Sequence, residues 1–340
     1  MKRIADVVRN SLLRCASGAV ALAVAVAPWS GAFAAPQGVA PRTIRPQAKL
    51  VPSTGLLFGA FHDPDSRWSG LHAEKEAITR YERKLGRKYA IGHHFVHWYG
   101  ELPDGMVRWD VRKGRIPMVS WEPYGASLRG IAAGNYDEMI ARKARALRDL
   151  AAPVFLRWGH EMNGYWYPWG GPNQHDTGTT NGPAHWIAAY RHVHDVFVRE
   201  GARNVVWVWG PNNESVPDDA WNDVEAYYPG DDYVDWVAAS GFNWGTLKEW
   251  SSWRSFGATF RSFYRRFATR KPIMIAETAS AKVGGSRSRW LREMARVAAE
   301  EMPSVAAIVY FNSDPRWVVR TDSRAFRAFR DVANQPHFNP

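Results

Sequence analysis

One segment in the middle of the chain holds the residues best suited to chemistry. The apolar run Val154–Leu156 predicts a buried strand. Its carboxyl end carries Arg157, His160 and Glu161, and four aromatics follow within Tyr165–Trp169. Aromatic faces stack on the C–H faces of pyranose rings, and a carboxyl can protonate a glycosidic oxygen. The pattern therefore indicates carbohydrate chemistry, and the alternative is a core strand followed by an aromatic-rich loop.

A second carboxylate gives Glu161 a partner. The short apolar strand predicted within residues 271–280 ends in Glu277. Glycosidases place two carboxyls on either side of the scissile bond. The two glutamates are about 116 residues apart, which is roughly three βα units of a barrel whose full circuit takes about 250 residues.

The order of predicted elements says what positions these residues. From Ser53 onward short apolar runs alternate with amphipathic stretches, which predicts strands alternating with helices. The predicted strands are 56–61, 89–97, 116–121, 153–158, 205–209, 235–241, 272–276 and 306–311. The predicted helices are 73–85, 136–150, 184–200, 255–268, 286–300 and 323–333, with less regular patterns at 107–113 and 221–227. Eight such units fit one α/β domain, a (β/α)8 TIM barrel over residues 53–335. The alternative, a doubly wound open sheet, needs a Gly-rich first turn that the sequence lacks.

Polar and aromatic clusters follow most of the predicted strands, where barrel loops build active sites. The clusters are His62-Asp63, His97-Trp98-Tyr99, Trp121-Glu122-Pro123-Tyr124, Asn212-Asn213, and Asn312 with Asp314 and Trp317. The candidate sugar-stacking side chains are Trp121, Trp166, Trp169 and Trp317, for which core packing is the alternative. His97 is a candidate for contact with a sugar hydroxyl. Neighbouring histidines of that strand alternate faces and lack nearby carboxylates, so we expect no metal and no cofactor.

Several segments resemble glycoside hydrolase family 26. Arg157, the motif His160-Glu-Met-Asn-Gly164 and Trp166 are similar to the strand that carries the family's acid/base residue. Ile275-Ala-Glu-Thr-Ala279 looks like its nucleophile strand. Segments 204–212 and 228–236 resemble its fifth strand and the stretch before its sixth. The resemblance runs from about residue 55 to about 329 and implies a (β/α)8 barrel that cleaves β-linked polysaccharides with retention. The family includes β-1,4-mannanases, mixed-linkage β-glucanases and β-1,3-xylanases.

The resemblance also implies roles for individual residues. Glu277 would be the nucleophile that forms a covalent glycosyl-enzyme. Glu161 would protonate the leaving oxygen and then deprotonate the incoming water. The Arg157 cation would keep Glu277 ionised. His160 would contact the substrate or Glu277.

One position departs from the family. A tyrosine that donates a hydrogen bond to the nucleophile is expected at the end of the sixth strand, but Phe242 stands there and cannot donate. Either the alignment of this strand is shifted, another donor replaces the tyrosine, or the enzyme is slow. Asn243 and Trp244 are the nearest substitutes and are candidate substrate contacts.

The amino terminus resembles a secretory signal. Basic residues precede an apolar stretch and an A-x-A site, which predicts cleavage after Ala34 and a secreted or periplasmic protein. Residues 35–52, rich in Pro, Gln and basic residues, predict a disordered linker. No other segment suggests a membrane span. The formal charge is +11, and removal of residues 1–34 would leave +8. With no phosphate loop or zinc spacing, we interpret this charge as surface composition, not as nucleic-acid binding.

These observations predict a monomeric endo-β-glycosidase that acts by double displacement on a β-1,4-linked glycan. The loop Tyr165-Trp-Tyr-Pro-Trp169 resembles the mixed-linkage glucanase branch more than the Trp-Phe-Trp-Trp run of the mannanases, but mannan and mixed-linkage glucan both stay open. Phe242 supports an alternative, a weak or inactive barrel that binds glycan in exopolysaccharide handling. A third interpretation is a basic protein of the envelope or a nucleic-acid-binding protein.

Overall fold

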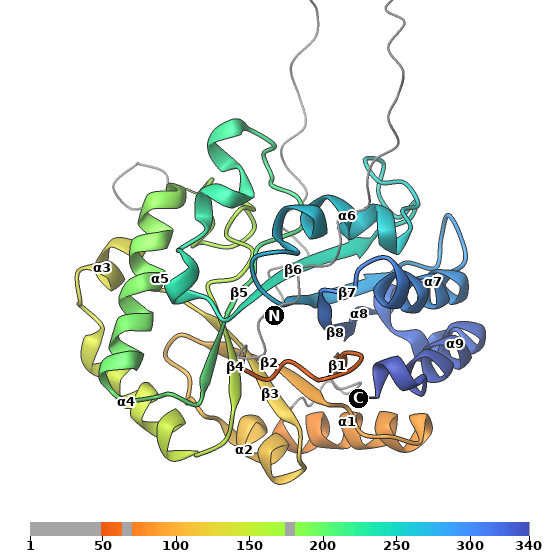
Figure 1. The fold of residues 1–340 in the computed structure, drawn as a ribbon, viewed down its shortest axis with the longest axis horizontal. Helices are drawn as coiled ribbons and strands as arrows, with labels where there is room; N and C mark the ends of the chain where they lie inside the picture. Colours follow the sequence, from red (N-terminus) through yellow and green to blue (C-terminus); the bar gives the residue numbers. More distant parts are fainter. Residues whose placement is uncertain (1–48, 63–69, 174–180, 340) are drawn as a thin grey trace, which may run out of the picture. The chain divides into compact units, whose positions relative to one another are not determined.

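The computed structural model describes residues 49–62, 70–173 and 181–339. Within them eight parallel strands form a closed barrel in sequence order, because β8 pairs with β1 over six residues (Figure 1). The strands are β1 Leu57–His62, β2 Ile91–His97, β3 Ile116–Glu122, β4 Val154–Trp158, β5 Val205–Trp209, β6 Trp236–Asn243, β7 Ile273–Ser280 and β8 Val305–Asn312. The predicted (β/α)8 barrel is confirmed, and the open sheet is excluded.

Helices surround this barrel. They are α1 Leu71–Leu85, α2 Gly105–Arg112, α3 Leu128–Ala132, α4 Asp137–Asp149, α5 Gly182–Arg199, α6 Phe256–Phe267, α7 Arg287–Glu300, α8 Asp314–Trp317 and α9 Ser323–Ala333. The short α3 and α8 were not predicted, because one turn leaves no periodic pattern. The pattern at 221–227 predicted a helix and was wrong there: two 3₁₀ turns, Ala220–Asn222 and Val224–Tyr227, occupy this stretch. Asp223, whose backbone is not helical, separates the turns, and its side chain accepts a hydrogen bond from the amide of Glu225.

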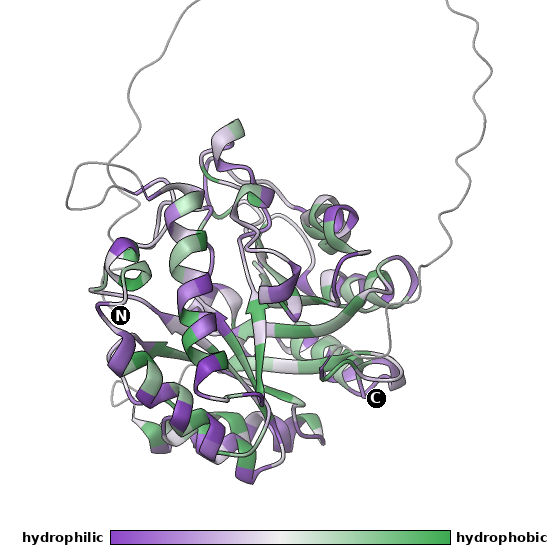
Figure 2. Cartoon of the chain, turned by 60° about the vertical axis from the view of Figure 1, so that its left-hand side comes forward, coloured by the Kyte–Doolittle hydropathy of each residue, from purple (hydrophilic) through white to green (hydrophobic). Residues whose placement is uncertain are grey.

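The apolar residues form two clusters, one on each side of the strands. The inner cluster fills the barrel below the site with residues such as Met118, Phe155 and Val208. The larger outer cluster lies between the strands and the helices. The strands are accordingly hydrophobic over most of their length, while polar residues gather on the outer helix faces (Figure 2). Polar side chains inside the barrel are therefore exceptions that need a reason.

Packed contacts extend past both predicted limits of the domain. Leu50 and Val51, in the predicted linker, pack against the inner cluster. The carbonyl of Lys49 accepts a hydrogen bond from Trp236 Nε1 at 2.8 Å. At the other end, Phe338 is fully buried. The predicted signal peptide and most of the linker lie outside the described residues. Across the described ranges, no helix combines the length and apolarity that a membrane span requires.

Candidate active site

A tight turn at the end of β4 presents Glu161. Gly159 and Glu161 both have positive φ, 54° and 53°, a conformation that is costly for a residue with a side chain. The turn is held from both sides. The Glu161 amide donates to the Gly210 carbonyl at 2.9 Å, and Trp169 Nε1 donates to the His160 carbonyl at 2.7 Å. A strained backbone that is so firmly held is typical of functional positions.

The carboxylate of Glu161 has an aromatic neighbour. Trp166 Nε1 donates to Glu161 Oε2 at 2.5 Å, so the predicted aromatic candidate and the predicted acid/base residue lie together. Gly164 makes this possible: a Cβ there would lie 2.3 Å from the Trp166 ring. The Trp166 side chain stays partly exposed and can still offer a face to a ligand.

An irregularity in β7 turns Glu277 toward the inside of the barrel. Against β6, Ala239 pairs with Ile275 but Ser240 pairs with Glu277, so one extra residue, Ala276, is inserted. Such a bulge changes which side chains face inward. Ala276 belongs to the inner cluster. The next residue, Glu277, also reaches the interior, where it meets Arg157.

Arg157 connects the strands around Glu277. It is fully buried and donates from Nη1 to Glu277 Oε1 and from Nη2 to Ser240 Oγ at 2.6 Å. Ser120 Oγ lies 3.3 Å from Nη1 and 2.8 Å from His93 Nε2. Gly210 leaves room for the guanidinium, because a Cβ there would lie 2.4 Å from Arg157 Nε. The predicted pairing of Arg157 with Glu277 is present.

The pKa of Glu277 reflects opposing influences, whereas the sequence suggested only the effect of the Arg157 cation. Burial raises the pKa of Glu277 to about 7, the Arg157 cation opposes this rise, and the charge of Glu161 adds to it. The influence of Glu161 indicates that the two carboxyls lie in one site. Arg157 therefore offsets part of the burial cost of a Glu277 anion but does not make this carboxyl strongly acidic.

Two further members of the site were not predicted from the sequence. Burial, followed by the charge of Glu277, raises the pKa of Glu122 to about 8, so this third carboxyl is neutral at pH 7. Tyr167 stacks on Trp169 at 4.4 Å between ring centroids, and burial and the three glutamates raise its pKa. Both residues belonged to the aromatic clusters noted after β3 and β4. Their positions after strands were the available signal.

His160 is neutral and enclosed. Burial, with the nearby Arg157 cation, lowers the pKa of His160 well below its usual value. Its ring lies 4.7 Å from Tyr167 and 5.7 Å from Trp169, centroid to centroid. Neither ring nitrogen has a hydrogen-bond partner among the described residues. The predicted contact with Glu277 is absent from the hydrogen bonds of this part of the chain.

Four predicted substrate contacts have packing roles here, which corrects the expectation for them. Trp121, Trp169 and Trp317 are 0%, 2% and 3% exposed, so none offers an open face to a sugar. Trp121 stacks on Trp98 in the outer cluster, because it points away from the interior on β3. Asn243 is also buried, and its Oδ1 accepts from the amides of Gly245 and Arg254, which fixes the loop after β6.

Other aromatic side chains keep exposed surface. His97 is exposed and lies parallel to Tyr124 at 5.9 Å. Trp244 is half-buried, with Trp250 at 5.6 Å beside it. Trp250 is 65% exposed and was not predicted, because it lies far along the loop after β6. His97 and Trp244 therefore remain candidates for ligand contact.

The structure identifies a donor beside the nucleophile position. Ser240, two residues before Phe242, is the β6 residue that pairs with Glu277, and its Oγ lies 3.5 Å from Glu277 Oε1. Phe242 instead packs on Trp317 and Phe311. Of the alternatives that Phe242 left open, replacement by another donor is the one this geometry supports.

The histidines that suggested a metal check have other partners. His94 contacts Asp110 outside the barrel, and His62 contacts Tyr89 and Asn312. Asp63 lies outside the described residues. In the described ranges, no three His, Cys, Asp or Glu side chains are grouped as a metal site requires.

A closed (β/α)8 barrel with acidic and aromatic side chains at the carboxyl ends of its strands is the architecture of the barrel glycoside hydrolases. Comparison with known proteins gives the family. The sequence model described as glycosyl hydrolase family 26 matches residues 128–263. The chain belongs to this family, which confirms the resemblance found in the sequence.

The similar proteins carry different names. Endoglucanase H of Acetivibrio thermocellus is 34% identical over 296 residues, which cover 85% of this chain and 31% of that protein. A β-1,3-xylanase, TXYA of a Vibrio species, is 32% identical over 60% of this chain and 43% of its own length. The chain thus spans less than half of either relative.

Solved structures support the fold. Mannanase man26 of Bacillus subtilis has a TM-score of 0.57 at 18% identity, covering 83% of this chain and 86% of that one. An endo-β-1,4-mannanase double mutant of Cellulomonas fimi has a TM-score of 0.61 at 19% identity, covering 83% and 71%. At these identities the likeness concerns the barrel alone.

Proposed function

We propose that this protein is a retaining endo-β-glycosidase that hydrolyses a β-1,4-containing glucan. The observation that carries the proposal is the group formed by Glu161, Glu277 and Arg157 at the carboxyl ends of β4 and β7. One carboxyl is bound by a buried cation and the other by an indole N–H, so their environments differ. Two carboxyls in unlike environments are what double displacement requires.

Glu277 attacks the anomeric carbon in its ionised form, while Arg157 and Ser240 hold one of its oxygens and leave the other to react. Glu161 donates its proton to the leaving oxygen and then takes a proton from water. Since Arg157 and Ser240 surround the nucleophile, Phe242 is no obstacle to turnover. The binding-only alternative therefore loses the feature on which it depended.

A glucan is favoured over mannan because Endoglucanase H is similar over 85% of this chain. A mannan endo-1,4-β-mannosidase of Caldalkalibacillus mannanilyticus is 35% identical over 32% of the chain. Glucose and mannose differ only at C2, so glucomannan is a second expected substrate. We also propose export and cleavage after Ala34, and a monomeric mature protein.

The decisive assay offers the mature protein, beginning at Ala35, five glycans side by side: barley β-glucan, glucomannan, galactomannan, xylan and carboxymethylcellulose. We expect reducing ends from barley β-glucan first, and oligosaccharides rather than monosaccharide as early products. Proton NMR of the first-formed anomer should report retention. Activity confined to xylan, or none on any of the five, would overturn the proposal.

A further inference from the structure

The loop after β6 presents an open indole at the rim of the barrel. Trp250 is 65% exposed, the largest fraction among the large apolar side chains in the part of the chain that the structure describes. A single exposed apolar side chain is common on protein surfaces, so its surroundings decide whether it has a role.

Trp250 is the outer end of a packed row of indoles formed with Trp244 and Trp317. The Trp244 ring lies 5.6 Å from the Trp250 ring and 4.9 Å from the Trp317 ring, centroid to centroid. Trp317 is buried, Trp244 is half-buried and Trp250 is exposed, so the indole row runs from the core outward to solvent. Trp250 is therefore attached to the barrel and not an isolated surface residue.

The backbone that carries this row is held in place. Gly245 has a positive φ of 54° and lies so close to the loop after β7 that a Cβ there would be 2.0 Å from the Val283 carbonyl oxygen. Its amide donates to Asn243 Oδ1 at 3.1 Å, and its carbonyl accepts from Ser251 Oγ at 2.8 Å. A loop that already has its shape loses little freedom when a ligand binds.

The indole row lies at the same end of the barrel as the nucleophile position. β6 and β8 are the two neighbours of β7, which carries Glu277 (Figure 1). Trp244 directly follows β6, and Trp317 belongs to α8 directly after β8. Glu277 is buried inside the barrel and Trp250 is at the rim, so a ring on Trp250 is not the ring that reacts.

We propose that Trp250 and Trp244 form a subsite for one pyranose ring of a neutral β-linked glycan, away from the bond that is cleaved. The indoles offer a surface for the C–H face of the ring. The guanidinium of Arg316 lies 5.4 Å from the Trp244 ring and supplies donors for hydroxyls at the ring edge. Asp314 holds this guanidinium, with Nε 2.7 Å from Oδ1. The class of ligand rests on the proposed function.

A protein partner fits this surface less well than a sugar. A stable protein interface buries about 800 Å² on each partner, whereas one Trp side chain supplies at most about 250 Å². The row is also bordered by the charged Arg316, whose side chain is 40% exposed and would lose water in an apolar interface. A small aromatic surface with a polar edge is typical of a sugar-binding site.

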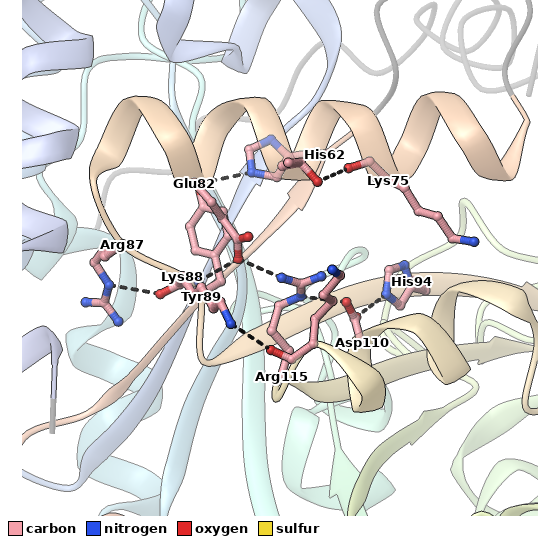
Figure 3. Close-up of polar contacts among 11 residues, drawn as sticks. His62, Lys75, Glu82, Arg87, Lys88, Tyr89, His94, Asp110 and Arg115 are labelled. Carbon is pink, nitrogen blue, oxygen red and sulfur yellow. Dashed lines mark hydrogen bonds and ion pairs between the residues drawn. The ribbon is translucent and has the colours of Figure 1, made fainter.

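One polar cluster outside the site differs from the indole row, because its members bind one another (Figure 3). Arg115 donates to Glu82 at 2.8 Å and to Asp110 at 2.7 Å. Asp110 also contacts His94 at 2.5 Å. These contacts use the charged groups to hold α1 and α2 on β2, whereas Trp250 keeps most of its surface open.

The test measures binding without cleavage, in affinity gels that contain barley β-glucan or glucomannan. Every protein in the gels carries Glu277→Gln, and this parent is compared with Trp250→Ala, Trp250→Phe and Trp221→Ala. Trp221 is the matched control, because it is a 45% exposed Trp in the 3₁₀ turn after β5. We expect Trp250→Ala to lose affinity about fivefold to tenfold, Trp250→Phe about threefold or less, and Trp221→Ala less than twofold.

A second measurement uses the active protein. Trp250→Ala should lower kcat/KM on barley β-glucan through a higher KM, and the loss should shrink on a trisaccharide that is too short to reach the rim. Binding that depends on Trp250 without any hydrolysis would contradict the proposed function and still support the subsite.

Three outcomes would overturn the subsite. They are equal losses in Trp250→Ala and Trp221→Ala, no retention of the parent in either gel, and a parent that is dimeric in size-exclusion chromatography but becomes monomeric with Trp250→Ala. The last result would assign the surface to a second copy of this chain.

Discussion

Two buried arginines, Arg115 and Arg157, lie in networks that look alike and differ in one respect. Arg115 pairs with two carboxylates, Glu82 and Asp110, and is covered by Trp109. Among the described residues, Arg157 contacts one carboxylate, Glu277, and otherwise only serine hydroxyls and a carbonyl. A guanidinium that pairs with two carboxylates has a structural role, because both ion pairs hold helices together. One that shares a single carboxylate with an open site leaves that carboxylate available for chemistry.

The comparison shows how a structural and a functional buried ion pair can be distinguished. Both arginines are nearly inaccessible, so burial does not separate them. Their partners separate the two arginines, because Glu277 contacts a cation and still has a pKa raised to about 7. A group near its titration point at neutral pH can change charge during a reaction, which is the usual mark of a catalytic position.

The largest expected effect is on catalysis at Glu277. Glu277→Gln should lower kcat by about a thousandfold or more, or about 4 kcal/mol of barrier, because the covalent route is lost. Steady-state hydrolysis of barley β-glucan measures it. The amide still accepts from Arg157, whereas Glu277→Ala would leave a buried cation unpaired and lower stability as well. Retention of more than a tenth of the parent rate would exclude Glu277 as the nucleophile.

The second-largest expected effect is on stability and concerns Arg115. Arg115→Met should lower the free energy of unfolding by about 3–5 kcal/mol, because Glu82 and Asp110 lose a buried partner. Urea unfolding measures the change, and kcat of the folded fraction should equal that of the parent. A stable Arg115→Met protein with reduced kcat would remove the distinction between the two networks.

The barrel was predictable because its signals are local and repeated. Short apolar runs bounded by polar clusters recur eight times, and closure of the sheet follows from their number. Glu161 and Glu277 could be singled out for the same reason, since each follows a short apolar run, although Glu277 lies within β7 and not at its end. The burial of Trp121, Trp169 and Trp317 was not, because the face to which an aromatic residue points depends on its neighbours in space.

The bulge at Ala276 shows a second limit of the sequence. It moves Glu277 by one position relative to Ser240, and no residue in the strand predicts the bulge. The sequence pointed to Phe242, two positions further along, whereas Ser240 is the residue whose hydroxyl lies beside Glu277. Register between strands is set by the whole barrel and cannot be obtained from one strand.

A third prediction concerns the pH dependence of stability. The pKa of Glu122 is raised by burial to about 8, above its ordinary value of 4.5, so its neutral form stabilises the fold and this contribution is lost as pH rises through about 8. Glu122→Gln stays neutral. Its stability relative to the parent should therefore increase between pH 5 and pH 9 by on the order of 4 kcal/mol, since about three units of the pKa shift lie above pH 5 and each is worth about 1.4 kcal/mol.

Urea midpoints at pH 5, 7 and 9 measure this effect. Glu101→Gln, an exposed glutamate with a side chain 72% accessible, is the matched control and should show no such trend. The same slope in both variants would mean that Glu122 titrates as an ordinary surface carboxyl and does not belong to the site.

The smallest effect tests the strain at Glu161 and needs two substitutions at one position. With φ at 53°, any side chain beyond Cα is strained, and glycine alone adopts this conformation freely. Glu161→Gly should therefore be more stable than Glu161→Ala by about 1 kcal/mol, although glycine usually costs stability by gaining freedom in the unfolded chain. Both variants should lose hydrolysis of polysaccharide, because neither has an acid to donate. Thermal melting of the two proteins measures the difference. If Glu161→Ala were the more stable, the turn would not be strained, and its hydrogen bond to Gly210 would be ordinary loop structure rather than support for a catalytic position.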